Sequence, residues 1–106
     1  MKRPKTEAKF YGYWHHKCLI AVIEITVKNK QIGICSLAVT PKFFRKGIPN
    51  QLISYVLQTF DCKQAFVETA VENLPAINLY KKHGFIEKNI WKTSDGFHIQ
   101  SLLKII

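Results

Sequence analysis

One short segment of the 106-residue chain has the features of an anion site. The apolar run that ends at Val39 is followed by the basic turn Arg45-Lys46-Gly47, and then by apolar residues at helical spacing. The first turn of a helix has backbone N–H groups without partners and carries the positive end of the helix dipole. Because glycine adds no side-chain bulk to that turn, the segment predicts a place where backbone N–H groups bind a phosphate.

A second segment, from Asn73 to Phe85, combines a helix with a phenol. Asn73 is a good helix cap, and Pro75 is tolerated in the first helical turn. Gly84 follows three basic or imidazole side chains and suits a left-handed helix end. Tyr80 lies inside this helix, but a single tyrosine on a helix is usually a core or rim residue, so its type alone assigns it no role.

Together the two segments resemble the signatures of the GNAT superfamily of N-acetyltransferases. In the first signature, an apolar strand precedes Gln/Arg-x-x-Gly-x-Gly/Ala at the start of a helix. Here Phe44 stands at the Gln/Arg position, Gly47 at the first glycine and Pro49 at the second, so only Gly47 matches. The second signature, Asn-x-x-Ala-x-x-Leu-Tyr-x-Lys-x-Gly-Phe, matches from Asn73 to Phe85 at every position. The resemblance extends from about Ile20 to the C-terminus.

The resemblance implies acetyl-coenzyme A (acetyl-CoA) as the cofactor. In the family, the pantetheine arm pairs with the backbone at the end of the first strand, where a splay or bulge aims an N–H at the thioester carbonyl. The pyrophosphate lies on the N–H groups of the turn, and the cap of the second helix contacts the pantetheine. The cofactor-binding residues implied here are Leu37, Ala38, Val39, Phe44, Arg45, Lys46, Gly47, Ile48, Pro49, Asn50 and Asn73.

Two of these residues depart from the family pattern. Phe44 lacks the side-chain donors of Gln or Arg, and Pro49 has no N–H. Pro49 nevertheless suits the first helical position, where its fixed φ helps the turn. Losing one hydrogen bond to a charged group costs about 1.5–3 kcal/mol, so we expect binding that is roughly ten- to a hundredfold weaker.

The resemblance also implies a catalytic role for Tyr80, as the acid that protonates the departing thiolate. The general base stays open. The strand from Gln31 to Val39 contains no carboxylate, which leaves Glu68, Glu72, a histidine or a chain of water molecules. We assign no metal site, because adjacent residues such as His15 and His16 point to opposite faces of a strand.

The elements around these segments predict an α/β (α+β) fold. We expect a mixed, mostly antiparallel sheet with a parallel β-α-β core that binds acetyl-CoA and helices packed on it. The strands ending at Val39 and near Thr69 should splay apart around the pantetheine arm. The expected strands are Lys9–Trp14, Cys18–Val27 with Leu19 and Ala21 on its buried face, Gln31–Val39, Ala65–Ala70, Phe85–Trp91 and Phe97–Ile105, and the helices end near Asp61 and Gly84.

Composition favours a single domain over residues 1–106, with a net charge of +9 that suits acidic partners. No apolar run approaches the ~20 residues of a membrane span, and the polar start Met1 to Glu7 lacks the apolar core of a signal peptide. The odd set Cys18, Cys35 and Cys62 suggests buried, reduced thiols. The expected compartment is the cytoplasm.

The favoured function is direct acetyl transfer from acetyl-CoA to a small-molecule or peptide amine. Family members usually have a strand and one or two helices before the strand that begins near Cys18, whereas about seventeen residues precede it here. The acceptor half is therefore expected to be reduced, and a homodimer could complete it. One alternative is a CoA-binding sensor without turnover. A basic nucleic-acid-binding module is the least favoured, since no stacking signature or reading helix accompanies the charge.

Overall fold

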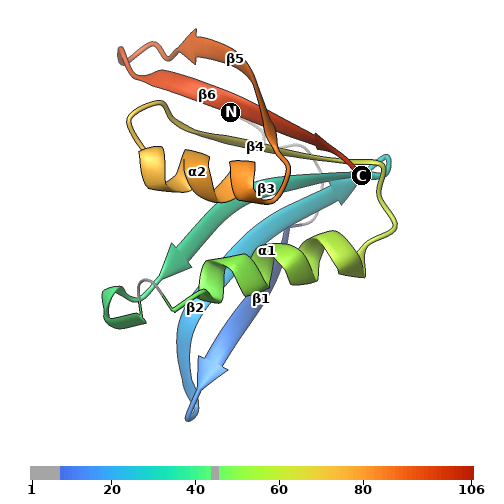
Figure 1. The fold of residues 1–106 in the computed structure, drawn as a ribbon, viewed down its shortest axis with the longest axis vertical. Helices are drawn as coiled ribbons and strands as arrows, with labels where there is room; N and C mark the ends of the chain where they lie inside the picture. Colours follow the sequence, from blue (N-terminus) through green and yellow to red (C-terminus); the bar gives the residue numbers. More distant parts are fainter. Residues whose placement is uncertain (1–7, 44–45) are drawn as a thin grey trace.

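The computed structural model describes residues 8–43 and 46–106. Their elements follow the order β1 (Ala8–His15), β2 (Cys18–Lys28), β3 (Gln31–Val39), the short 3₁₀ helix η1 (Pro41–Phe43), α1 (Ile48–Thr59), β4 (Gln64–Ala70), α2 (Leu74–Lys82), β5 (Ile86–Lys92) and β6 (His98–Ile105). The strands form one sheet in the order β1-β2-β3-β4-β6-β5, in which β3 and β4 are the parallel pair (Figure 1). The predicted α/β fold is confirmed.

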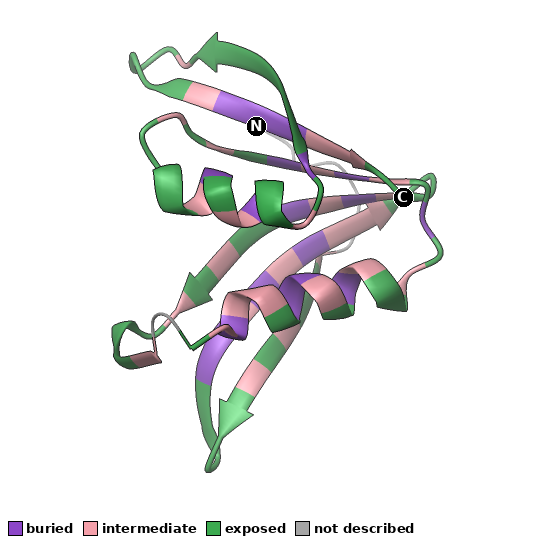
Figure 2. Cartoon of the chain, in the orientation of Figure 1, coloured by how far each residue is buried: buried purple, intermediate pink, exposed green. Residues whose placement is uncertain are grey.

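Both helices lie on the same side of the sheet (Figure 1). Their apolar stripes and the inward side chains of the strands form one core, which Figure 2 shows as the buried stretches between the layers. The largest fully buried side chains are Ile23, Ile25, Ile32, Ile53, Val56 and Leu102. Among the described residues no helix covers the opposite side, which we call the open face of the sheet.

Strand β2 follows the predicted alternation except at its start. Ala21, Ile23 and Ile25 are buried, but Leu19 is 48% exposed, so placing it on the buried face was wrong. The register explains the error: Tyr13 pairs with Ala21 and Trp14 with Leu19, which leaves Ile20 as an extra residue. Such a bulge turns the side chains beyond it to the other face.

Strands β3 and β4 diverge as predicted. Their parallel pairing runs from Gln31 opposite Gln64 to Ile34 opposite Val67 and goes no further, although both strands continue. The divergence begins at a second bulge, where Ile25 pairs with Ile34 and Glu24 with Ser36. Cys35 is the extra residue, and the increased local twist turns the rest of β3 away from β4.

The cysteines correct one prediction. Cys62 is buried, but Cys18 and Cys35 are exposed free thiols. Cys18 begins β2 directly after the hairpin turn, and the bulge places Cys35 outside the core.

Two features are absent from residues 8–43 and 46–106. No three His, Cys, Asp or Glu side chains there come together as metal ligands would. Over the same ranges, no helix combines the length and the apolar character needed to cross a membrane.

Candidate functional site

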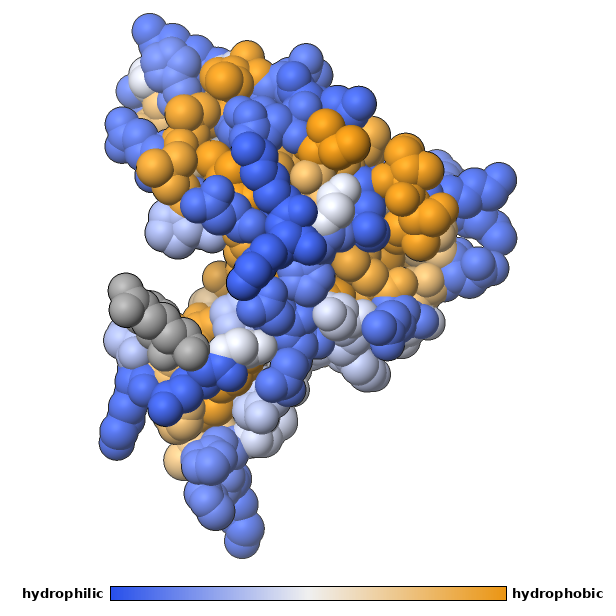
Figure 3. All heavy atoms as spheres, in the orientation of Figure 1, coloured by the Kyte–Doolittle hydropathy of each residue, from blue (hydrophilic) through white to orange (hydrophobic). Residues whose placement is uncertain are grey.

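A cavity of about 260 Å³ occupies the gap between the diverging strands; we call it the slot. Its lining comes from β3 (Ile34, Cys35, Ser36, Leu37), from β4 (Val67, Glu68, Thr69) and from α2 with its cap (Asn73, Ala76, Tyr80). On the helix-covered side, the surface is notched beside α2 (Figure 3). The slot therefore lies between the strand that precedes the basic turn and the helix of the second sequence segment.

Tyr80 lines the slot from the helix side. Tyr80 is 5% exposed. Its ring packs edge-on with the ring of Phe85, and the two ring centroids are 5.5 Å apart. Burial raises the pKa of Tyr80 to about 12. None of the side-chain hydrogen bonds found among the described residues involves its hydroxyl, and this oxygen is not a fully buried atom, so it faces the open space of the slot. The phenol is thus protonated at neutral pH and is free to donate to a group bound in the slot.

Glu68 lines the slot from the open face. It follows the core residue Val67 on β4, so its side chain points away from the helices. Its Oε2 accepts a hydrogen bond from the Trp91 indole N–H at 2.7 Å, which holds the carboxylate in place. Glu72 is exposed and no histidine lines the slot. Among the candidate bases named from the sequence, only Glu68 lies with Tyr80.

The backbone at the end of β3 is divided between two neighbours. Thr40 N–H donates to the Ile20 carbonyl at 2.8 Å, so this end of β3 is still bonded to β2. Alternate residues of an antiparallel strand face opposite neighbours. Ala38 therefore faces β2 like Thr40, whereas Leu37 and Val39 turn their N–H and C=O groups toward the slot.

The predicted phosphate turn has the expected backbone. Gly47 is the N-cap of α1 with φ of +74°, and no side chain caps the helix there. A Cβ added at Gly47 would meet no atom within 4 Å, so the space outside it is open. Ile48 is buried, and Pro49 follows it in the first helical turn, at the second position and not at the predicted first.

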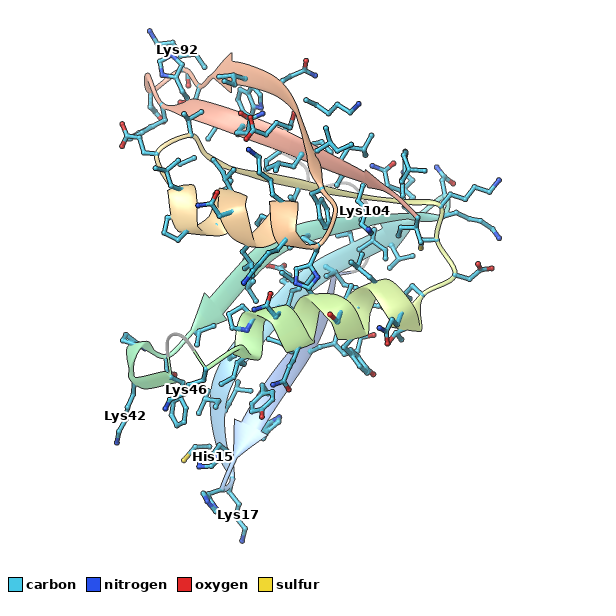
Figure 4. All side chains as sticks on the ribbon, viewed as in Figure 1. His15, Lys17, Lys42, Lys46, Lys92 and Lys104 are labelled. Carbon is cyan, nitrogen blue, oxygen red and sulfur yellow. The ribbon has the colours of Figure 1, made fainter. Side chains whose placement is uncertain are left out.

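Positive charge flanks this turn. Lys46 directly precedes Gly47, and Lys42 lies on the same loop (Figure 4). Phe44 and Arg45 lie outside the described residues.

Two asparagines have structural partners at the site. The Asn73 side chain accepts a hydrogen bond from Ala76 N–H at 3.3 Å, which confirms it as the cap of α2. Asn50 Oδ1 lies 2.9 Å from His83 Nε2, so this pair ties the first turn of α1 to the end of α2. Burial and the nearby Lys104 and Lys82 hold the pKa of His83 below its usual value.

Acid is expected to destabilise the protein through His83. Its folded pKa is lower than the ordinary value of 6.5, so the unfolded chain accepts a proton that the folded protein resists. Its contribution to stability is present above about pH 6.5 and is lost as the pH falls through the folded pKa. His83→Gln keeps a donor for Asn50 without the titration. As the pH is lowered from about 8 to 5, the denaturant midpoint of the wild type should fall more steeply than that of His83→Gln. Identical slopes of midpoint against pH would contradict this.

Comparisons with known proteins agree with this geometry. The sequence model of the acetyltransferase (GNAT) family matches residues 2–85. The UPF0157 protein YqkA of Bacillus subtilis is 34% identical over 103 residues, which cover 92% of this chain and 30% of YqkA. An N-alpha-acetyltransferase of Sulfurisphaera tokodaii is 34% identical over 65 residues, which cover 58% of this chain and 39% of that protein. The chain thus spans well under half of the length of these two relatives.

The fold also recurs among solved structures. A GNAT family acetyltransferase from Elizabethkingia anophelis with acetyl-CoA bound has a TM-score of 0.85 to this chain at 19% identity. The match covers 93% of this chain and 76% of that one.

Proposed function

The chain belongs to the acetyltransferase (GNAT) family, and from that premise we propose that it transfers an acetyl group from acetyl-CoA to a primary amine by direct attack on the thioester. The observation that carries this proposal is the slot. A buried, protonated phenol lines it from the helix side, and a hydrogen-bonded carboxylate lines it from the open face. An amine and a thioester that meet between them would have a base and an acid on opposite sides.

The free edge of β3 supports the proposed place of the pantetheine arm. Leu37 and Val39 direct backbone donors and acceptors toward the slot, so an extended amide chain could pair with them as a strand would. Ala38 contributes as part of the same strand, although its own polar groups face β2. The Asn73 carboxamide lines the slot from the other side and keeps its N–H₂ group for a ligand carbonyl, since its oxygen caps α2.

The first turn of α1 supports the proposed place of the pyrophosphate. The N–H groups of Gly47, Ile48 and Asn50 lie at the positive end of the helix, with Lys46 beside them. Phe44 and Arg45 are proposed as further contacts from the sequence alone. Pro49 contributes no donor, so the reduced affinity expected from the sequence still applies.

Gly47→Val is expected to weaken CoA binding at least ten- to a hundredfold, because the side chain would project into the open space where phosphate contacts are proposed. A residue with a Cβ at this positive φ also costs at least about 1–2 kcal/mol of stability. Gly96→Val is the matched control: Gly96 has φ of +92° in the β5–β6 turn, away from the slot. Calorimetric titration should show weak binding by the first variant alone. Equal CoA affinity of the two variants would refute the proposed phosphate site at Gly47.

The residues of the slot have separate tasks in this proposal. Acetyl-CoA supplies an activated acetyl thioester. Glu68 accepts a proton from the incoming ammonium, directly or through one water, so that the nitrogen becomes nucleophilic. The Tyr80 hydroxyl would donate its proton to the departing sulfur. After each turnover it would take a proton back from solvent.

A second candidate function is CoA binding without turnover. Pro49 favours it, because a first helical turn without one N–H is a weaker phosphate site. A homodimer that completes the acceptor half stays a proposal from the sequence. We propose the cytoplasm as the compartment, where the free thiols Cys18 and Cys35 would stay reduced.

Release of free CoA from acetyl-CoA, followed with a panel of small amines and short peptides, tests the proposal. We expect release that depends on an amine. Tight acetyl-CoA binding with no amine-dependent release would favour the sensor, and no binding at all would contradict both functions.

A further inference from the structure

Glu24 is a second carboxylate at the open mouth of the slot. It lies on β2 directly opposite Ser36 of β3, and the Ser36 hydroxyl donates to its Oε1 at 3.2 Å. Ser36 is itself a lining residue of the slot. The Glu24 carboxylate is therefore fixed beside the cavity by one of its walls.

Glu24 and Glu68 lie on the same face of the sheet. Glu24 alternates with the core residues Ile23 and Ile25, and Glu68 follows the core residue Val67, so both carboxylates point to the open face. Strand β3 separates their strands, and β3 and β4 have already diverged beyond Ile34 and Val67, so β2 and β4 lie further apart there than the ~10 Å of two strand spacings. The two carboxylates thus flank the place where an acceptor would enter.

Neither carboxylate has a cationic partner among the described residues. The ion pairs found there join Lys30 to Asp61 and Lys81 to Glu87. The chain has sixteen Lys and Arg residues against seven Asp and Glu. Two carboxylates without a cationic partner beside one cavity therefore form a local negative region on a protein with a net charge of +9.

Apolar surface borders this region on both sides. Phe10 pairs with Glu24 across β1 and β2 and is 64% exposed, and the Trp91 ring that holds Glu68 is 44% exposed. The buried Tyr80, whose hydroxyl is unpartnered among the described residues, marks the other end of the same cavity as a ligand site. A ligand suited to this surface has two positive groups joined by an apolar chain.

We propose that the acceptor is a linear aliphatic diamine, whose reacting nitrogen lies at Glu68 while its second ammonium binds Glu24. This inference rests on the proposed acetyl transfer and names its substrate class. The Glu24 contact acts on binding and takes no part in the chemical step. It should therefore change the KM for the amine and leave kcat unchanged.

The test compares amines of equal chain length with one or two nitrogens: putrescine against butylamine, and cadaverine against pentylamine. The wild type should have a KM about tenfold lower for each diamine, the effect of one charge-assisted hydrogen bond. Glu24→Gln keeps an acceptor for Ser36 but removes the charge, so it should raise the diamine KM to that of the monoamine. The monoamine KM should not change.

Asp61→Asn is the control for net charge, since Asp61 is fully exposed near the other end of β3 and β4. It should keep the preference for diamines. Equal KM values of the wild type for diamine and monoamine would overturn the inference. A preference for diamines that survives Glu24→Gln would also overturn it. Both outcomes would leave the proposed acetyl transfer standing. Turnover of a peptide amine but of neither diamine would also overturn the inference. Failure to acetylate any amine would instead refute the proposed function.

Discussion

Tyr80→Phe is expected to lower turnover by about 10²–10⁴-fold while acetyl-CoA affinity is retained. The substitution keeps the ring and its contact with Phe85 but removes the proton that the leaving sulfur requires. Because burial raises the pKa of Tyr80 to about 12, the wild-type phenol keeps this proton well above neutral pH. The turnover rate of the wild type should therefore not fall through tyrosine ionisation near pH 10, where an ordinary tyrosine titrates.

Stability separates this role from a structural one. The Tyr80 hydroxyl makes no hydrogen bond within the described part of the chain, so the variant should unfold at nearly the wild-type denaturant concentration. The measurement is the rate of CoA release together with calorimetric affinity for both proteins. An active wild type matched by its Phe variant would remove Tyr80 from the mechanism.

Glu68→Gln is expected to reduce turnover by a similar 10²–10⁴-fold at neutral pH, because the incoming ammonium loses its base. Glutamine still accepts the hydrogen bond from Trp91, so the geometry of the slot should be preserved. Glu72→Gln is the matched control, since Glu72 is exposed and does not line the slot. Only the Glu68 variant should lose activity in assays of CoA release.

The pH dependence of this defect provides a second check. Aliphatic amines titrate near pH 10.4, so above that pH the acceptor is already neutral and needs no base. The ratio of wild-type to Glu68→Gln rates should therefore shrink toward one as the pH rises. A ratio that stays constant up to that pH would assign Glu68 a structural role.

Much of the fold could be predicted because local patterns specify it. The alternating apolar residues of β2 and β3, the capped helix from Asn73 and the glycine at Gly47 each have a local physical cause. The divergence of β3 and β4 could be predicted because each of these strands is followed by one of the two segments expected to bind the cofactor. In these places the sequence and the structure agree within a few residues.

The remaining features depend on contacts between distant parts of the chain. No local pattern marks the bulges at Ile20 and Cys35, which decide that Leu19 and Cys35 leave the core. The base was ambiguous because β6 lies between β4 and β5 in the sheet, and only that order brings Trp91 to Glu68. Sheet order sets such contacts, and a single sequence does not reveal it.

The most direct test of acetyl transfer in the slot uses acetyl-CoA with an isotopically labelled acetyl group. After incubation with protein and amine, mass spectrometry locates the label. We predict a labelled amide of the amine in equal amount to the free CoA released, and no label on the protein. Label bound covalently at Cys35, whose thiol lines the slot, would contradict direct attack. If acetyl-CoA binds and is recovered intact, with no labelled amide, the proposed acetyl transfer is contradicted.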